Sequence, residues 1–126
     1  MKILIADPHP EVQSALQLIL HRIPEVTEVR EAGSLVQLLA LCAQSCPDLI
    51  LFDLNLVAPS RSRAQSLADF ISVLRRLCPC SQLVGMSSRF ETEQEAKIAG
   101  ANGYISKTAP PDEVLSSIVR FLKQSS

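Results

Sequence analysis

Two acids, a hydroxyl and an ammonium group each follow a short strand-like run in this chain. The runs are residues 3–5 ahead of Asp7, 49–52 ahead of Asp53, 83–86 ahead of Ser87 and 103–106 ahead of Lys107. An aspartate can attack phosphorus to form an acyl phosphate. Mg²⁺ takes one or two carboxylates and keeps several waters, while lysine and hydroxyl groups neutralise phosphoryl oxygens. The four side chains are therefore the set that phosphoryl transfer to an aspartate requires.

The segments that must position these side chains alternate between strand-like apolar runs and helix-like spacing of apolar residues. Buried strands are predicted at 3–5, 49–52, 83–86 and 103–106, with a weaker edge strand at 27–31. Helices are predicted from 10 to about 23, 35 to about 46, 67–77, 91–99 and 110–122. Such alternation indicates a parallel sheet covered on both faces, hence a three-layer, doubly wound α/β fold with five strands and five helices. Residues 1–126 are expected to form one domain.

In a doubly wound sheet, ligands bind beyond the carboxyl ends of the strands. Because the four chemical residues each end a predicted strand, we expect Asp7, Asp53, Ser87 and Lys107 to meet at one edge of the sheet. Two neighbouring carboxylates repel each other unless a cation relieves them. The pattern therefore predicts a divalent cation at this edge.

Composition excludes several other classes. The 126 residues are 47% hydrophobic and 20% charged, and the net charge of −1 shows no basic surplus for nucleic acid. No apolar run is long enough to span a membrane, and the first is too short for a signal peptide. We therefore expect a cytoplasmic domain with neither membrane nor direct nucleic-acid contact, its cysteines being reduced thiols.

Three segments resemble the receiver domains of response regulators, especially those attached to helix-turn-helix regulators of the LuxR or NarL type. They are residues 4–10 (LIADPHP), 47–55 (PDLILFDLN) and 100–107 (GANGYISK). The resemblance implies a flavodoxin-like sheet with strand order 2-1-3-4-5. It also implies Mg²⁺-dependent phosphorylation of Asp53, with Asp7, Asp53 and the backbone carbonyl of Asn55 as metal ligands.

The same resemblance assigns the remaining roles and the partners. Ser87 would bond the phosphoryl oxygen, Lys107 would pair with it, and Tyr104 would reorient when Ser87 moves inward. The phosphoryl group would come from a histidine kinase, a phosphotransfer protein or a small donor. The output would be a changed surface on the fourth helix, fifth strand and fifth helix, read by an output protein or fused effector domain, with a homodimer also plausible. Beyond self-phosphorylation and self-dephosphorylation, no enzymatic activity is expected.

The sequence departs from the family pattern at three places. Family members carry two adjacent acids after the first strand, and Ala6 stands at the first, which predicts weaker Mg²⁺ binding. The loop after Asp53 (54–61) lacks the usual proline–glycine pair, and Arg61 and Arg63 are expected to replace part of the metal charge near a phosphate. The interval from Ser87 to Lys107 is about two residues short, so counting back from the lysine reaches Gly85 and Ser88 is a fallback. These departures motivate an alternative, a pseudo-receiver that binds partners without being phosphorylated.

Four cysteines motivate a third hypothesis. Cys42 and Cys46 precede the third strand, and Cys78 and Cys80 precede the fourth, so all four should gather at the sheet edge opposite the acids. A four-thiolate zinc site or a redox pair is conceivable there, against the simpler reading of small buried hydrophobes and loop thiols. Phe121, off the apolar stripe of the last helix, is a candidate for a dimer or partner surface.

Overall fold

The computed structural model describes residues 1–57, 63–88 and 92–124, apart from the side chains of 63, 64, 92, 93, 95 and 98. In chain order the elements are β1 (Lys2–Ala6), α1 (Pro10–Leu20), β2 (Glu28–Ala32), α2 (Leu35–Gln44), β3 (Leu49–Asp53), the 3₁₀ helix η1 (Leu54–Leu56), α3 (Arg63–Leu77), β4 (Gln82–Ser87), α4 (Thr92–Ala99), β5 (Gly103–Ser106) and α5 (Pro111–Gln124).

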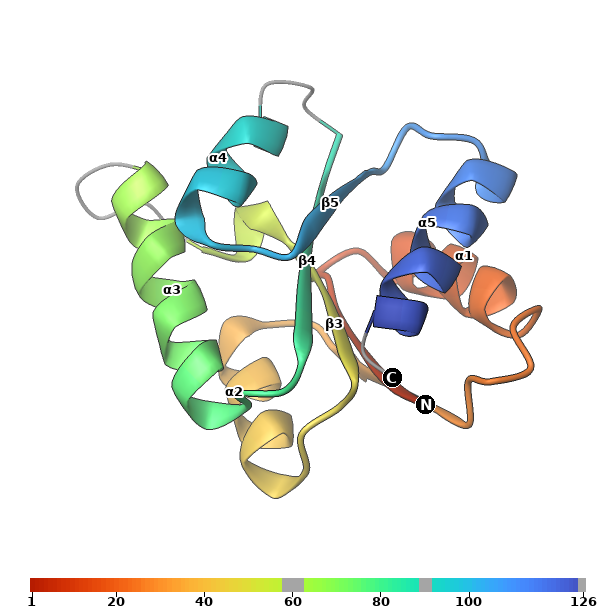
Figure 1. Cartoon of the computed structure of the whole chain (residues 1–126), viewed down its shortest axis with the longest axis horizontal. Coiled ribbons are helices and arrows are strands. Elements are labelled where there is room, and N and C mark those ends of the chain that lie inside the picture. The colour runs from red at the N-terminus through yellow and green to blue at the C-terminus, as the bar shows by residue number, and fades with distance from the viewer. Residues whose placement is uncertain (58–62, 89–91, 125–126) are drawn as a thin grey trace.

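The strands form a parallel sheet in the order β2-β1-β3-β4-β5, which confirms the predicted flavodoxin-like α/β fold. Helices α2, α3 and α4 lie on one face, and α1 and α5 lie on the other (Figure 1). β2 pairs only with β1, so it is the edge strand that its weak pattern predicted. β3 lies at the centre, and each of its residues is buried.

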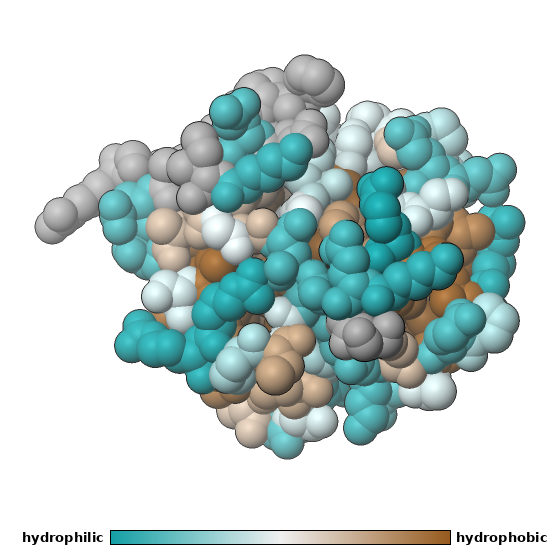
Figure 2. Space-filling model, in the orientation of Figure 1, coloured by the Kyte–Doolittle hydropathy of each residue, from teal (hydrophilic) through white to brown (hydrophobic). Residues whose placement is uncertain are grey.

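Alternate residues of each central strand enter two separate cores. Leu4 and Phe52 pack on the side of α2 and α3, while Ile5 and Leu51 pack on the side of α1 and α5. Because both faces are covered, both sets are apolar, which is why these strands are continuous apolar runs in the sequence. The face shown in Figure 2 is mostly hydrophilic, with hydrophobic side chains in small separate areas. Within the described residues, no helix is both long and apolar enough to cross a membrane.

Local signals set the helix ends. Pro10 is the first residue of α1, Ser34 accepts a hydrogen bond from the Gln37 amide at the start of α2, and Gly100 ends α4 with a φ of 105°. The expected end of α1 near residue 23 was wrong, since the helix stops at Leu20. The expected start of α3 at 67 was also late, because its first turn is polar and carries no apolar stripe. The predicted start of α4 at 91 lies outside the described residues.

Phe121 is part of the core rather than of an exposed surface. Its side chain is 6% exposed and packs with the cluster beneath α1 and α5. A Cβ placed on Gly103 would come within 2.2 Å of the Phe121 ring, so β5 approaches α5 closely only because residue 103 has no side chain. The expectation of a partner surface at Phe121 is therefore wrong.

Gly103→Ala should lower the free energy of unfolding by about 1–3 kcal/mol, because the added methyl overpacks this contact. Urea denaturation measures the change, and adding Phe121→Leu should recover part of the loss. Gly33→Ala is the matched control, since its new Cβ would meet only Gln37 Oε1 at 3.5 Å. A Gly103→Ala variant as stable as the control would contradict the packing described.

Candidate functional site

Four polar side chains gather where the central strands end. Asp7 follows β1 directly, Asp53 is the last residue of β3, Ser87 is the last of β4, and Lys107 follows β5. The pairing of β4 with β5 aligns Ser87 with Ser106, one residue before Lys107. All four therefore lie at the carboxyl edge of the sheet, as the order of strands and polar residues in the sequence predicted.

One ammonium group bridges the two carboxylates. Lys107 Nζ lies 2.6 Å from Asp7 Oδ2 and 3.0 Å from Asp53 Oδ2. Both aspartates are 0% exposed, while the lysine side chain is 14% exposed. Two buried negative charges thus share one positive charge, and the cluster keeps an excess of one negative charge. A buried uncompensated charge is unfavourable, so the site favours a further cation.

The two oxygens of Asp53 have different surroundings. Oδ1 accepts a hydrogen bond of 3.0 Å from the amide of Asn55, which makes Asp53 the N-cap of η1. Oδ2 receives no hydrogen bond from a donor other than the Lys107 ammonium in the part of the chain that the structure describes. The cap fixes the orientation of the carboxylate, and Oδ2 is the oxygen that faces Lys107.

Asp7 is held by the turn that follows β1. Its Oδ1 accepts a hydrogen bond of 2.8 Å from the amide of His9, and the His9 ring nitrogen Nδ1 lies 2.9 Å from the same oxygen. Gln13 donates through Nε2 to the backbone carbonyl of Asp7 at 2.7 Å. The N-cap of α1 is His9, so Asp7 does not cap this helix. These contacts direct Asp7 Oδ2 toward Lys107.

His9 is a residue of the site that sequence reasoning did not assign to it. Its Nδ1 lies 3.9 Å from Asp53 Oδ2, and its side chain is about half exposed (51%) at the mouth of the cluster. The available signal was its position two residues after Asp7, within the same turn. The three potential ligand atoms of Asp7, His9 and Asp53 all lie within 4.8 Å of one another.

The donor set suits a hard divalent cation. Asp7 and Asp53 present buried Oδ2 atoms, and the backbone of Asn55 follows in the adjoining turn. Carboxylate and carbonyl oxygens are the ligands that Mg²⁺ takes in proteins, usually only one or two carboxylates together with waters. The ligand atoms of Asp7, His9 and Asp53 lie close enough together to surround one ion, so the residues present fit the Mg²⁺ site that the sequence resemblance implies.

Ala6 has a different place from the one expected. Its side chain is 0% exposed and belongs to the core between the sheet and α2–α3, beside its sheet neighbours Ala32 and Phe52. An acid at position 6 would therefore enter apolar packing rather than the cation site. The neighbour of Asp7 on the loop side is Pro8, which brings no carboxylate. Ala6 is thus no physical reason for weak Mg²⁺ binding.

Gly85, Ser87 and Ser88, the three positions that the sequence left open, differ in burial and contacts. Gly85 pairs with Phe52 in the interior of the sheet and has no side chain, and Ser88 is exposed beyond the strand. Ser87 is 0% exposed, and its carbonyl oxygen accepts hydrogen bonds from the Lys107 amide (2.9 Å) and the Tyr104 hydroxyl (3.0 Å). Ser87 is therefore the serine joined to Lys107 and Tyr104.

The cysteines gather at the opposite edge, as expected, but not as four thiols. Cys46 and Cys78 form a disulfide, which corrects the expectation of fully reduced cysteines. Cys42 is a buried free thiol and Cys80 an exposed one. Burial raises the pKa of Cys42 above its ordinary value, with a smaller opposing effect of the Arg30 charge. Among the described residues no group of cysteines is arranged to hold a metal ion. Arg61 and the side chain of Arg63 lie outside the described part.

Removing the bridging ammonium should destabilise the fold. Lys107→Met leaves two buried carboxylates without their cation, and we expect a loss of roughly 3 kcal/mol in the free energy of unfolding at neutral pH. Urea denaturation measures it, with Lys2→Met on the exposed start of β1 as the control. Adding Asp53→Asn should restore part of the loss by removing one of the two charges. Equal stability of Lys107→Met and wild type would contradict the bridge.

The raised pKa of Cys42 predicts a low reactivity of this thiol. Because the thiolate is the reactive form, iodoacetamide at neutral pH should alkylate Cys80 quickly and Cys42 only after unfolding. Peptide mass mapping of native and urea-treated protein distinguishes the two. Equally fast labelling of both residues in the native protein would contradict the burial of Cys42.

Comparison with known proteins identifies the family. The sequence model of the response regulator receiver domain matches residues 3–119. The uncharacterized transcriptional regulatory protein YxjL of Bacillus subtilis is 30% identical over 121 residues, covering 94% of this chain and 52% of that protein. The nitrate/nitrite response regulator protein NarL of Escherichia coli is 30% identical over 118 residues, covering 92% and 52%. The chain spans about half the length of these curated relatives.

Solved structures agree with the assignment. A LuxR family DNA-binding response regulator from Silicibacter pomeroyi superposes with a TM-score of 0.77 at 27% identity, covering 98% of this chain and 93% of that one. A CheY-like response regulator receiver domain from Methanospirillum hungatei has the same fold, with a TM-score of 0.75 at 24% identity and coverages of 98% and 94%. The chain therefore belongs to the response regulator receiver domain family of two-component systems.

Proposed function

We propose that residues 1–126 act as one phosphoacceptor receiver domain, with Asp53 as the acceptor. The observation that carries the proposal is the contact of Lys107 Nζ with both Asp7 Oδ2 (2.6 Å) and Asp53 Oδ2 (3.0 Å) at the carboxyl edge of the sheet. It combines a fixed nucleophilic oxygen, an excess negative charge that a cation would neutralise, and an ammonium group beside the reacting atom. Phosphoryl transfer needs these three features together.

The reaction is a displacement at phosphorus. Asp53 Oδ2 forms a new bond to the phosphorus of the donor, and the bond from phosphorus to the donor's leaving group breaks. The hydrogen bond from the Asn55 amide to Oδ1 keeps the carboxylate in one orientation. Lys107 neutralises the phosphoryl oxygens, and Ser87 contributes a hydroxyl donor. Bound Mg²⁺, held by Asp7, Asp53 and the backbone carbonyl of Asn55, would supply further neutralisation of charge.

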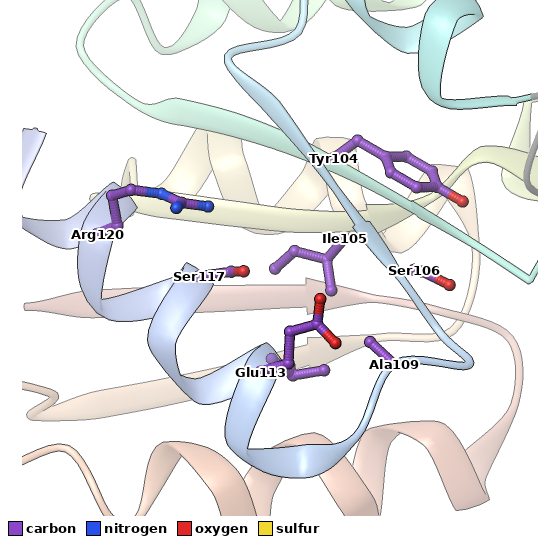
Figure 3. A pocket seen from close by; sticks show the side chains of 8 residues that line it. Tyr104, Ile105, Ser106, Ala109, Glu113, Ser117 and Arg120 are labelled. Atoms are coloured by element: carbon purple, nitrogen blue, oxygen red, sulfur yellow. The ribbon is translucent and has the colours of Figure 1, made fainter.

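We propose that phosphorylation of Asp53 changes the positions of Ser87 and Tyr104. The Tyr104 hydroxyl donates to the carbonyl oxygen of Ser87, so movement of Ser87 toward a phosphoryl group changes the partner of the tyrosine. Tyr104 lies on β5 between α4 and α5. Figure 3 shows it beside a pocket lined by β5 and α5, with Glu113 and Arg120 on the helix side. A surface on α4, β5 and α5 would therefore depend on the state of Asp53.

The partners follow from the same proposal. A histidine kinase or phosphotransfer protein would supply the phosphoryl group, and an output protein or fused effector domain would respond to it. Both relatives described above are regulatory proteins about twice the length of this chain, and NarL is a response regulator for nitrate and nitrite. A homodimer that depends on phosphorylation is compatible with this scheme. DNA contact would belong to an effector domain and not to these residues.

Acetyl phosphate tests the proposal directly. Intact mass spectrometry should show a gain of one phosphoryl group in the presence of Mg²⁺, and neither the Mg²⁺-free sample nor Asp53→Asn should gain it. Asp69→Asn, which removes an exposed carboxylate on α3, is the matched control and should be labelled like wild type. Labelling that survives Asp53→Asn would overturn the assignment. A folded wild type that stays unlabelled at high Mg²⁺ would instead favour the pseudo-receiver.

A further inference from the structure

A disulfide joins two helix ends at the edge of the sheet opposite the acidic site. Cys46 follows α2 and Cys78 follows α3, and the two are 32 residues apart in sequence with Cα atoms 5.5 Å apart. Figure 1 shows the C-terminal end of α3 beside α2 at this edge. The disulfide therefore closes the core between α2 and α3 at the end remote from Asp53.

The sheet itself brings the two cysteines together. Each is followed by a proline, Pro47 or Pro79, and the residue before a proline favours extended over helical conformation, so the chain leads on into a strand. Those strands, β3 and β4, are neighbours, and the segments leading into them are also bonded to each other. The Ser81 hydroxyl donates to the carbonyl of Pro47 (2.5 Å), and the Gln82 amide donates to the carbonyl of Asp48 (2.9 Å). The cysteines are thus held within bonding range by contacts that do not involve sulfur.

The two cysteines differ in exposure. Cys46 is an exposed residue, whereas Cys78 is 0% exposed. Thiol–disulfide exchange begins with attack of a thiolate on an accessible sulfur. An incoming thiolate would therefore attack Cys46, and Cys78 would be the leaving group.

The surroundings also suit the reduced state. The carbonyl oxygen of Leu77 lies 3.3 Å from Cys46 Sγ, and that of Cys42 lies 3.8 Å from Cys78 Sγ. Once reduced, each cysteine would find an acceptor for its S–H group within this distance. Breaking the disulfide therefore leaves no polar group without a possible partner, and both oxidation states fit the same packing.

The end of α3 also contacts the segment before β5. Arg75, in the last turn of α3, donates to the carbonyl oxygens of Ser81 (3.0 Å) and Gly100 (3.1 Å) and to Asn102 Oδ1 (2.7 Å). The disulfide lies three residues further on, at Cys78. Whatever fixes the end of α3 therefore also fixes the segment 100–102, which leads into the strand that carries Tyr104.

We propose that Cys46–Cys78 is a reversible thiol–disulfide exchange site whose state sets how firmly the end of α3 and the segment 100–102 are held. A thiolate of a dithiol reductant bonds to Cys46 Sγ, and the electron pair of the broken S–S bond leaves on Cys78, which takes up a proton. The second thiol of the reductant then displaces Cys46 and leaves the reductant as a disulfide. Two electrons and two protons are transferred to the protein, and glutathione disulfide would reverse the reaction.

Glutathione buffers test the exchange on the folded wild-type chain. As the fraction of reduced glutathione rises, the number of thiols counted after acid quenching and unfolding should increase from two to four, with peptide mapping assigning the change to Cys46 and Cys78. The melting temperature should fall on the order of 10 °C on reduction, because the disulfide closes a long loop of the unfolded chain. Cys46→Ser should abolish both changes, and Cys80→Ser, which alters an exposed thiol nearby, should keep both.

Two results of this titration would overturn the exchange site. If Cys46 and Cys78 stay reduced in excess glutathione disulfide, they do not form the disulfide. If they stay oxidised in excess reduced glutathione, the disulfide is not reversible. Both are decided by thiol counts on wild type, so they do not depend on a variant that folds. Hydrogen exchange of the amides at 100–104 tests the second part of the proposal. Faster exchange after reduction is expected, and identical exchange in both states would contradict control of this segment.

Discussion

A single ammonium group shared by two buried carboxylates is the constraint on which the rest of the structure depends. Asp7 and Asp53 are completely buried at the ends of the adjacent strands β1 and β3, so their like charges repel unless a cation lies between them. Lys107 supplies that cation from the end of β5, two strands away from β3. The bridge thus joins the end of β5 to the centre of the sheet, at the edge where doubly wound sheets bind ligands.

The same bridge supports the proposal that the domain is a phosphorylation switch. One positive charge against two negative ones leaves the site ready for a further cation, and a phosphoryl group would change this balance again. The Ser87 carbonyl is bonded both to the backbone of Lys107 and to the hydroxyl of Tyr104, so the charged edge and the surface of β5 share one residue. At the opposite edge of the sheet, the disulfide connects the ends of α2 and α3. The acidic site and the disulfide therefore lie at opposite ends of the strands.

The sequence predicted the architecture and most of the acidic site, because both depend on simple periodicity. Continuous apolar runs identify strands buried on both faces, and the polar residue that ends each run must lie at the sheet edge, which located Asp7, Asp53, Ser87 and Lys107. What depends on side-chain direction was not predictable. Ala6 was interpreted as a missing ligand although it points into the core, and only the structure shows that Phe121 fills the space left by Gly103. His9 and the pairing of Cys46 with Cys78 needed three-dimensional distances that no sequence spacing contains.

The assignment of Asp53 as the phosphoryl acceptor is tested most directly by locating the phosphoryl group chemically. Borohydride reduces an aspartyl phosphate to homoserine, and tandem mass spectrometry then identifies the residue that carried it. After incubation with acetyl phosphate and Mg²⁺, homoserine is expected at position 53. Homoserine at another acid, or none in a sample whose intact mass shows one added phosphoryl group, would contradict the claim that the oxygen held beside Lys107 is the acceptor.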